Sequence, residues 1–453
     1  MIFAGICLMA VSCASNGKKA ENDAAVKLIT LDPGHFHAAL VQKRSYPQVD
    51  NNVYVYAPQG DDLKEHLKKV EAYNNREDDP TSWNEVVYAG DDFLQKMIDE
   101  KKGNVVVLAG NNKEKVNYIE KSLDAGFNVL ADKPMAIDPA GFRQLQKCFD
   151  KAKEKGLVFY DIMTERNEIT TMLQKELSMV PSVYGTQLQG TPQEPAFYTE
   201  SVHHLYKEVS GVPLIRPDWF YDVECQGEGI VDVTTHLVDL VQWETFPGQS
   251  IDYDRDIELL DANRWPTPVS LKQFTMSTTK TEFPDFLKKY VKDDVLDYYC
   301  NGDILYKIKG VTAKVSVTWE FSYPEGGGDT HYSIMKGSKA DLIIRQGKEQ
   351  SFRPELYIEA VKADADYGKA LEAAIAKLAE KYPGIALVNL SEGKWQVTIP
   401  DVYRVGHEAH FGQVMDNYLE YLQNGNMPEW EVPGMIAKYR LTTSALEMAR
   451  SKK

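Results

Sequence analysis

The chain is 453 residues long and 43% of its residues are hydrophobic. This is enough apolar material for a large core, which argues against a disordered chain and allows either two domains or one domain with large insertions. The formal net charge of -16 excludes a nucleic-acid partner, because phosphate binding needs a basic surface and no Lys/Arg stripe is present.

The first 13 residues, MIFAGICLMAVSC, form a short apolar run that ends in small residues and a cysteine. The run is too short to cross a bilayer. It resembles a secretory signal followed by the lipobox of a bacterial lipoprotein, in which Cys13 carries the acyl chains. An ordinary cleaved signal or a chance apolar start are the alternatives. We predict that residues 1–25 are signal and tether, and that the protein is exported in a Gram-negative bacterium, held to the membrane on the periplasmic side only through Cys13.

Residues 26–165 alternate short β-branched apolar runs with segments of helical periodicity. The runs are KLITLD, NVYVYA, NEVVYA, NVVVLAG, NVLADKP and LVFYDIM. This alternation is typical of βαβ units and predicts an α/β domain with a doubly wound parallel sheet of the Rossmann type. Ligands of such sheets bind beyond the carboxyl ends of the strands, so the residues directly after each run are candidates for chemistry.

The first run is followed by Asp-Pro-Gly-His-Phe-His, where a dinucleotide-binding turn has G-x-G-x-x-G. Only Gly34 is kept, while Asp32 and His37 replace the first and third glycines. A tight turn before a helix still offers free N–H groups to a phosphate. We therefore predict cofactor contacts at Gly34, His35 and Phe36; an ordinary turn between a strand and a helix is the alternative.

The second run ends near Asp61 and Asp62, either of which could bind the ribose hydroxyls from one turn later. We predict Asp61 as the ribose contact. No Arg follows this run to neutralise a 2′-phosphate, so NAD is favoured over NADP.

The fourth and fifth runs lead to polar residues that we predict to bind the cofactor: Gly110, Asn111, Asn112, Asp132 and Lys133. Lys133 stands before a proline and is held in extended geometry, so its ammonium can project into the crevice. It can hydrogen-bond a substrate hydroxyl and a ribose hydroxyl together, and desolvation is expected to lower its pKa towards the range of proton transfer. A solvated loop lysine is the alternative.

Residues 166–453 show a different sequence pattern, in which predicted strands follow one another and alternate apolar and polar residues. This predicts a second, α+β domain with a mainly antiparallel sheet that is covered on one face. The segments near residues 251–299 and 351–390 are predicted to be insertions.

Asp232 and His236 are four residues apart at the start of a predicted helix, so both can address one hydroxyl. Removal of hydride from a carbinol leaves a proton for a base, and imidazole titrates near the working pH. We predict His236 as this base, with Asp232 as its helper and Lys133 beside them; a histidine bonded within the core is the alternative.

Further polar and aromatic residues suit a carbohydrate, whose CH faces stack on rings while its hydroxyls bind polar groups. The predicted substrate contacts are Arg166, His203, His204, Trp219 and His407; surface decoration is the alternative. His407, Glu408 and His410 have a spacing one residue short of the zinc motif H-E-x-x-H. We therefore predict no metal site, although metal binding, substrate contact and structural hydrogen bonding all stay open for this pair of histidines.

Two segments together resemble the glucose–fructose oxidoreductase / inositol dehydrogenase / MocA (Gfo/Idh/MocA) family. They are A-G-x-x-V-L-x-D-K-P-x-A at residues 125–136 and the later D-x-x-x-H-x-x-D that begins at Asp232. Asn112 matches the cofactor-binding Asn of the family, Asp132-Lys133-Pro134 its Glu-Lys-Pro, and Asp232 and His236 its substrate Asp and catalytic His. The resemblance covers essentially the whole mature chain. It implies a Rossmann domain, a large open sheet domain, a nicotinamide cofactor, hydride transfer at a sugar ring carbon, and a dimer or tetramer.

We therefore predict an NAD(P)-dependent oxidoreductase that acts on a ring hydroxyl of a sugar, glycoside or polyol and retains its cofactor between turnovers. One alternative is a glycosidase or lyase that oxidises its substrate transiently and then eliminates the aglycone. Another is a sugar-binding lipoprotein without catalytic activity.

Overall fold

The computed structural model describes residues 25–452 except 210–211 and 324–325. The predicted signal, lipobox and Cys13 anchor lie outside the described residues. Within the described part of the chain, no helix is both long and apolar enough to cross a membrane.

The N-terminal domain is a six-stranded parallel sheet with the strand order β3-β2-β1-β4-β5-β6. This is the order of a dinucleotide-binding domain, with the switch point between β1 and β4. The strands are β1 (Leu28–Leu31), β2 (Asn52–Ala57), β3 (Asn84–Ala89), β4 (Val105–Leu108), β5 (Asn128–Asp132) and β6 (Phe159–Ile162). The helices are α1 (His37–Leu40), α2 (Asp61–Asn75), α3 (Phe93–Glu100), α4 (Asn112–Ala125) and α5 (Pro139–Lys155). All six predicted strands and the Rossmann fold are confirmed.

The second domain is built on a ten-stranded sheet with the order β10-β12-β13-β7-β14-β15-β16-β18-β17, and β11 pairs with β12. Its strands are β7 (Phe197–Tyr206), β10 (Ile257–Ser270), β11 (Val291–Lys292), β12 (Val295–Ile308), β13 (Val311–Ser322), β14 (Thr330–Lys336), β15 (Ala340–Gln346), β16 (Glu355–Ala360), β17 (Ala386–Ser391) and β18 (Lys394–Thr398). A small hairpin, β8 (Glu208–Val209) and β9 (Val212–Pro213), lies apart from it. The pair β13–β7 is parallel and the other pairs are antiparallel, so the sheet is mixed.

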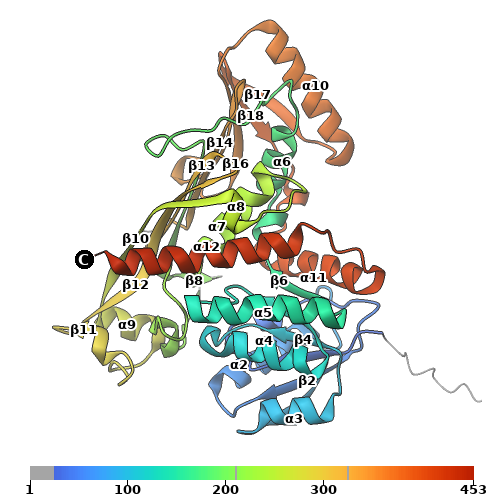
Figure 1. The fold of residues 1–453 in the computed structure, drawn as a ribbon, viewed down its shortest axis with the longest axis vertical. Helices are drawn as coiled ribbons and strands as arrows, with labels where there is room; N and C mark the ends of the chain where they lie inside the picture. The colour runs from blue at the N-terminus through green and yellow to red at the C-terminus, as the bar shows by residue number, and fades with distance from the viewer. Residues whose placement is uncertain (1–24, 210–211, 324–325, 453) are drawn as a thin grey trace, which may run out of the picture.

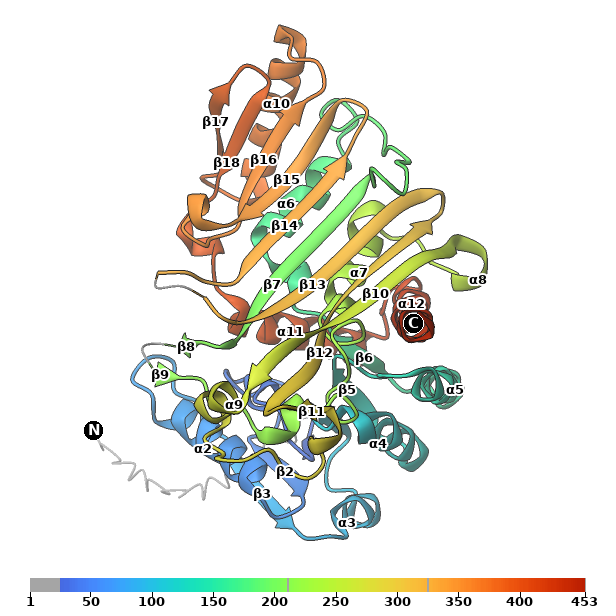
Figure 2. The same ribbon diagram turned by 90° about the vertical axis from the view of Figure 1, so that its left-hand side faces the viewer.

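Helices cover one face of this sheet, and the other face is open (Figure 2). The helices of the domain are α6 (Ile169–Ser178), α7 (Thr234–Thr245), α8 (Tyr253–Asp256), α9 (Leu271–Thr278), α10 (Ala365–Lys381), α11 (His407–Asn424) and α12 (Glu431–Ser451). The two segments predicted as insertions supply the two edges of the sheet: residues 251–299 contain β10, and residues 351–390 contain β16, α10 and most of β17.

The last two long helices connect the domains. Residues of α11 such as Phe411 and Met415 pack into the core of the Rossmann domain. On α12, Met435 and Tyr439 join the same core, whereas Leu441 joins the core under the large sheet. Figure 1 shows α12 lying between the two domains. The return of the chain to the first domain places the start of α11 beside the carboxyl ends of the Rossmann strands.

Candidate active site

The centre of the site is an ion pair between the end of β5 and the turn before α7. Lys133 Nζ lies 2.7 Å from Asp232 Oδ1, and Gln226 Nε2 donates to Asp232 Oδ2 at 3.1 Å. Burial opposes both charges, but the attraction between them is stronger, so the pKa of Lys133 is raised and the pKa of Asp232 is lowered. The expectation that desolvation would lower the pKa of Lys133 is therefore wrong, and Lys133 is a charged hydrogen-bond donor.

His236 lies in the first turn of α7 and is a neutral imidazole. Burial, followed by repulsion from Lys133, lowers its pKa to about 4. Its Nδ1 atom is buried and has no hydrogen-bond partner among the described residues. A neutral imidazole next to a fixed ammonium can accept a proton from a hydroxyl that the ammonium also contacts.

Lys115 hydrogen-bonds to residues next to this ion pair, and the sequence prediction missed it. Its fully buried ammonium donates to Asn112 Oδ1 at 2.6 Å and to the main-chain oxygens of Asp132 and Pro134 at 2.9 and 3.1 Å. Burial lowers the pKa of Lys115 to about 8. The available signal was its position four residues before Ile119, on the apolar side of α4.

Asn112, predicted to bind the cofactor, is held within the protein. Its Nδ2 donates to the main-chain oxygen of Gln226 at 2.8 Å, and its Oδ1 accepts from Lys115. It therefore fixes the loop before Asp232 to the start of α4.

The turn between β1 and α1 is hydrogen-bonded to the turn that follows β4. Gly34 N donates to the main-chain oxygen of Asp32 at 2.8 Å, and His35 N donates to that of Ala109 at 3.1 Å. A Cβ atom on Gly110, whose φ is +107°, would lie 2.5 Å from His35 N, so only glycine allows this approach. The two turns therefore use the N–H groups of Gly34 and His35 internally, contrary to the expectation that they are free for a phosphate.

The carboxylate of Asp32 stands in place of the first glycine and is also satisfied within the protein. It accepts hydrogen bonds from Asn111 Nδ2 at 2.8 Å and from the Tyr118 hydroxyl at 2.9 Å. Asn111, predicted to bind the cofactor, is thus tied to this turn. Phe36 is 37% exposed and lies at the rim.

Trp219 lies at the cofactor end of the crevice, which corrects its prediction as a substrate contact. Its Nε1 donates to Asp62 Oδ2 at 3.0 Å, and its ring lies 3.5 Å from the position of a Cβ on Gly34. The ribose prediction at Asp61 is corrected as well, because this side chain is 87% exposed and pairs with Lys64. Asp62 faces the crevice instead, and burial raises its pKa to about 6.

The crevice fits a dinucleotide. A Cβ on Gly34 would touch Asn111 N and Trp219 at 3.5 Å and Gly110 at 3.6 Å, so the missing side chain leaves a cradle at the switch point of the sheet. Asp62 offers an acceptor beside the second strand, and Lys133 offers donors at the other end. These residues would hold the ribose and the nicotinamide half, respectively.

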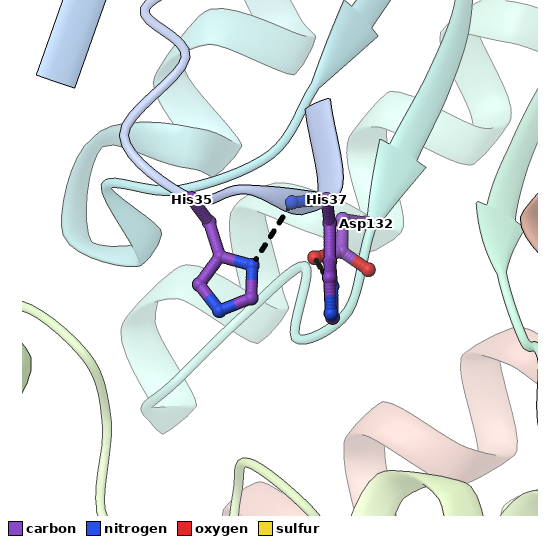
Figure 3. Close-up of side chains that lie close together, drawn as sticks. All are labelled: His35, His37 and Asp132. Atoms are coloured by element: carbon purple, nitrogen blue, oxygen red, sulfur yellow. Dashed lines mark hydrogen bonds and ion pairs between the residues drawn. The ribbon is translucent and has the colours of Figure 1, made fainter. Parts of the chain in front are cut away.

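His37 replaces the third glycine of the fingerprint and binds Asp132. Its Nδ1 lies 2.9 Å from Asp132 Oδ2, and its main-chain N–H donates to His35 Nδ1 at 3.4 Å. Figure 3 shows the His37 ring between His35 and Asp132. Burial lowers the pKa of both histidines well below the usual value, so both are neutral. Asp132 therefore contacts His37, and its predicted contact with the cofactor stays a prediction.

His407, at the start of α11, lies near His37 and contacts Glu165. Its Nδ1 lies 3.2 Å from Glu165 Oε1, and its ring centroid lies 5.9 Å from that of His37. Both nitrogens of the buried His410 have no partner among the described residues. Glu165 was missed by sequence reasoning, although it directly follows the sixth strand. The prediction of His407 as a substrate contact stays a prediction.

Arg166 is a structural residue, which corrects its prediction as a substrate contact. Its guanidinium binds both oxygens of Asp239 at 2.6 and 2.8 Å and both oxygens of Glu431 at 3.0 Å. Lys438 bridges Asp239 to Asp161, and together these side chains form a buried ionic network between β6, α7 and α12. The guanidinium is thus engaged by two carboxylates within the protein.

The neighbouring histidines of β7 point to opposite faces of the sheet. His203 shares the covered face with Phe197 and packs against Trp319, with a ring separation of 4.8 Å. His204 points to the open face and contacts Asp329 and Glu320, so its prediction as a substrate contact is corrected. The prediction for His203 stays open.

Two family models match nearly all of the described chain. Residues 35–160 match an oxidoreductase family with an NAD-binding Rossmann fold, GFO_IDH_MocA, and residues 173–450 match the family described as "Putative oxidoreductase C terminal domain". The chain belongs to the Gfo/Idh/MocA family of oxidoreductases. It is therefore an NAD(P)-dependent oxidoreductase, as the sequence predicted. Among curated proteins none matches this family member.

Solved structures agree with the Gfo/Idh/MocA assignment. A "putative oxidoreductase" from Parabacteroides merdae is 63% identical, with a TM-score of 0.93 over 95% of this chain and 98% of that chain. A "putative oxidoreductase" from Thermotoga maritima is 12% identical, with a TM-score of 0.60 over 94% and 99%. KijD10, a 3-ketoreductase from Actinomadura kijaniata solved with TDP-benzene and NADP, is 14% identical, with a TM-score of 0.58 over 93% and 97%. The last two share the fold.

Proposed function

We propose that this Gfo/Idh/MocA protein is an NAD-dependent oxidoreductase that interconverts a ring hydroxyl and a ketone on a sugar, glycoside or polyol, and that it retains its cofactor. The observation that carries the proposal is the neutral imidazole of His236 beside the ionised pair of Lys133 and Asp232, at the carboxyl edge of the Rossmann sheet. KijD10, which shares the fold, is a ketoreductase.

The bound nicotinamide would supply the hydride acceptor. His236 takes the proton of the hydroxyl, because its low pKa keeps the imidazole in the neutral form that can accept a proton. Lys133 donates to the same oxygen and stabilises the negative charge that develops there. Asp232 holds the ammonium in place and keeps it charged.

The charges around Asp62 favour NAD over NADP. Its pKa is raised by burial and then by the neighbouring carboxylates of Asp32, Asp218 and Asp61. A 2′-phosphate placed there would face several acidic groups, whereas the ribose hydroxyls of NAD would donate to Asp62.

We also propose that the protein is exported and lipid-anchored through Cys13, as the lipobox at residues 10–13 supports. The open face of the large sheet is the surface that we propose for assembly into a homo-oligomer.

Denaturing the purified protein and analysing the released small molecules by mass spectrometry tests the function. We expect NAD or NADH in a ratio near one per chain, and no NADP. Replacement of His236 by Asn should keep the nucleotide and lower turnover of the active sugar by about 10²–10⁴-fold. His204→Asn, on the open face, is the matched control.

Other results would favour the alternatives. Release of an aglycone from a glycoside without added cofactor would indicate the transient-oxidation mechanism. No bound nucleotide, together with unchanged sugar affinity in His236→Asn, would indicate a sugar-binding protein and would exclude the proposed function.

The pKa of His236 predicts an unusual pH profile. Because the neutral imidazole is the active form and its pKa is about 4, kcat/KM should stay level from pH 7.5 to about 5 and fall only below that. A histidine with its ordinary pKa of 6.5 would place the acid limb near that pH. Steady-state kinetics across this range, with circular dichroism at each pH to verify folding, measures the limb; a limb between pH 6 and 7 would contradict the assignment.

A further inference from the structure

We propose that His35, His37 and Asp132 form a binding site for one divalent transition-metal ion of the zinc class. The two histidines come from the turn between β1 and α1, and the aspartate comes from the end of β5 (Figure 3). One ligand atom from each residue lies within 4.8 Å of the other two. This inference goes beyond the proposed oxidoreductase function and does not depend on it.

The candidate ligand atoms lie close together. His35 Nδ1 accepts a hydrogen bond from the main-chain N–H of His37 at 3.4 Å, which holds its ring beside that of His37. His37 Nδ1 lies 2.9 Å from Asp132 Oδ2, and the two imidazole rings stand edge to face with centroids 4.0 Å apart. Ligand atoms of a tetrahedral zinc ion are about 3.3 Å apart, given metal–nitrogen distances near 2.0 Å. Small side-chain rotations would therefore bring all three atoms onto one ion.

An imidazole coordinates a metal in its neutral form, with the proton on the other ring nitrogen. Coordination through His37 Nδ1, the atom that contacts Asp132, therefore requires the proton of that ring to be on Nε2.

The carboxylate of Asp132 is buried and lies next to the two histidines. Asp132 is 3% exposed, and His37 Nδ1 lies 2.9 Å from its Oδ2. The two nearby lysines make their hydrogen bonds to other atoms: Lys115 donates to the main-chain oxygen of Asp132, and Lys133 pairs with Asp232. The carboxylate could therefore serve a metal ion at this position as an anionic ligand.

Two imidazoles and one carboxylate are a ligand set that suits zinc, iron, cobalt and similar ions. Three protein ligands leave at least one coordination position open, as in catalytic metal sites. His35 is partly buried, whereas His37 and Asp132 are buried.

Metal titration of the purified, chelator-treated protein tests the site. We expect one equivalent of Zn²⁺ to bind in isothermal titration calorimetry, and Co²⁺ to give the visible absorption bands of a low-symmetry site. Replacing His35 by Gln or Asp132 by Asn should weaken binding by at least about 10–100-fold. His331→Gln removes a half-buried histidine outside this cluster and should leave the affinity unchanged.

His37 is buried, and its replacement could unfold the turn, so the partly exposed His35 carries the test, with thermal unfolding as a check on folding. Absence of stoichiometric binding would overturn the proposal. So would binding that is unaffected by His35→Gln and Asp132→Asn, or binding that is lost instead in His407→Gln, which would place the ion at the start of α11.

Discussion

Replacement of Lys133 by Met is expected to lower kcat/KM by about 10³-fold, with most of the loss in kcat. The change removes the donor that stabilises the developing negative charge, a type of interaction that contributes about 10²–10³-fold. It also leaves Asp232, which is 9% exposed, without the ammonium at 2.7 Å that keeps it ionised. Steady-state kinetics on the sugar that the unaltered protein turns over fastest measures the effect.

Two further variants separate charge from geometry. Lys133→Arg keeps the positive charge but exchanges a compact ammonium for a planar guanidinium, so it should recover only part of the activity. Lys147→Met, on the exposed side of α5, is the control and should retain full activity. A loss of less than tenfold in Lys133→Met would contradict the role of Lys133 at the reacting oxygen.

Replacement of Lys438 by Met is expected to destabilise the protein by about 3–5 kcal/mol. Its fully buried ammonium lies 2.6 Å from Asp161 Oδ2 and 2.9 Å from Asp239 Oδ1. Without it, the side-chain partner left to Asp161 among the described residues is the hydroxyl of Tyr439 at 3.2 Å, so the buried carboxylate loses the cation that pairs with it. The free energy of unfolding in urea measures the loss.

Arg440 on the same helix provides the control, because its pair with Asp254 is exposed. Arg440→Met should change the free energy of unfolding by about 0–1 kcal/mol. Adding Asp161→Asn to Lys438→Met should recover part of the lost stability, since it removes the uncompensated charge. Equal effects of the Lys438 and Arg440 substitutions would contradict a stabilising buried network.

The Rossmann domain was predictable because each of its strands and helices has a recognisable pattern within a short stretch of sequence. The central strands β1 and β4 are fully buried apolar runs, as expected for a parallel sheet covered on both faces, and the other strands carry similar apolar cores. Lys133 and Asp232 were also accessible to sequence reasoning, since each belongs to a short motif at a strand end or a helix start. Their pairing joins residues 99 apart in the sequence, and this made the sign of the pKa shift of Lys133 unpredictable.

Other assignments failed because their partners are distant. Arg166 follows a strand end, like a ligand-binding residue, but Asp239 and Glu431 lie 73 and 265 residues further along the chain. Trp219 is a residue type that often stacks on sugars, yet its indole N–H donates to Asp62, which is 157 residues away in the sequence. A choice between Asp61 and Asp62 depends on the rotation of α2, which the sequence does not reveal.

Helix α12 packs against both domains and so restricts how far they can move relative to each other. Met435 and Tyr439 belong to one hydrophobic core, and Leu441, less than two turns further on, belongs to the other. Because one helix packs into both cores, a hinge motion between the two domains would have to disrupt its packing against one of them. We therefore expect ligands to enter the site through local movement of loops and side chains, with the two domains keeping their relative position during turnover.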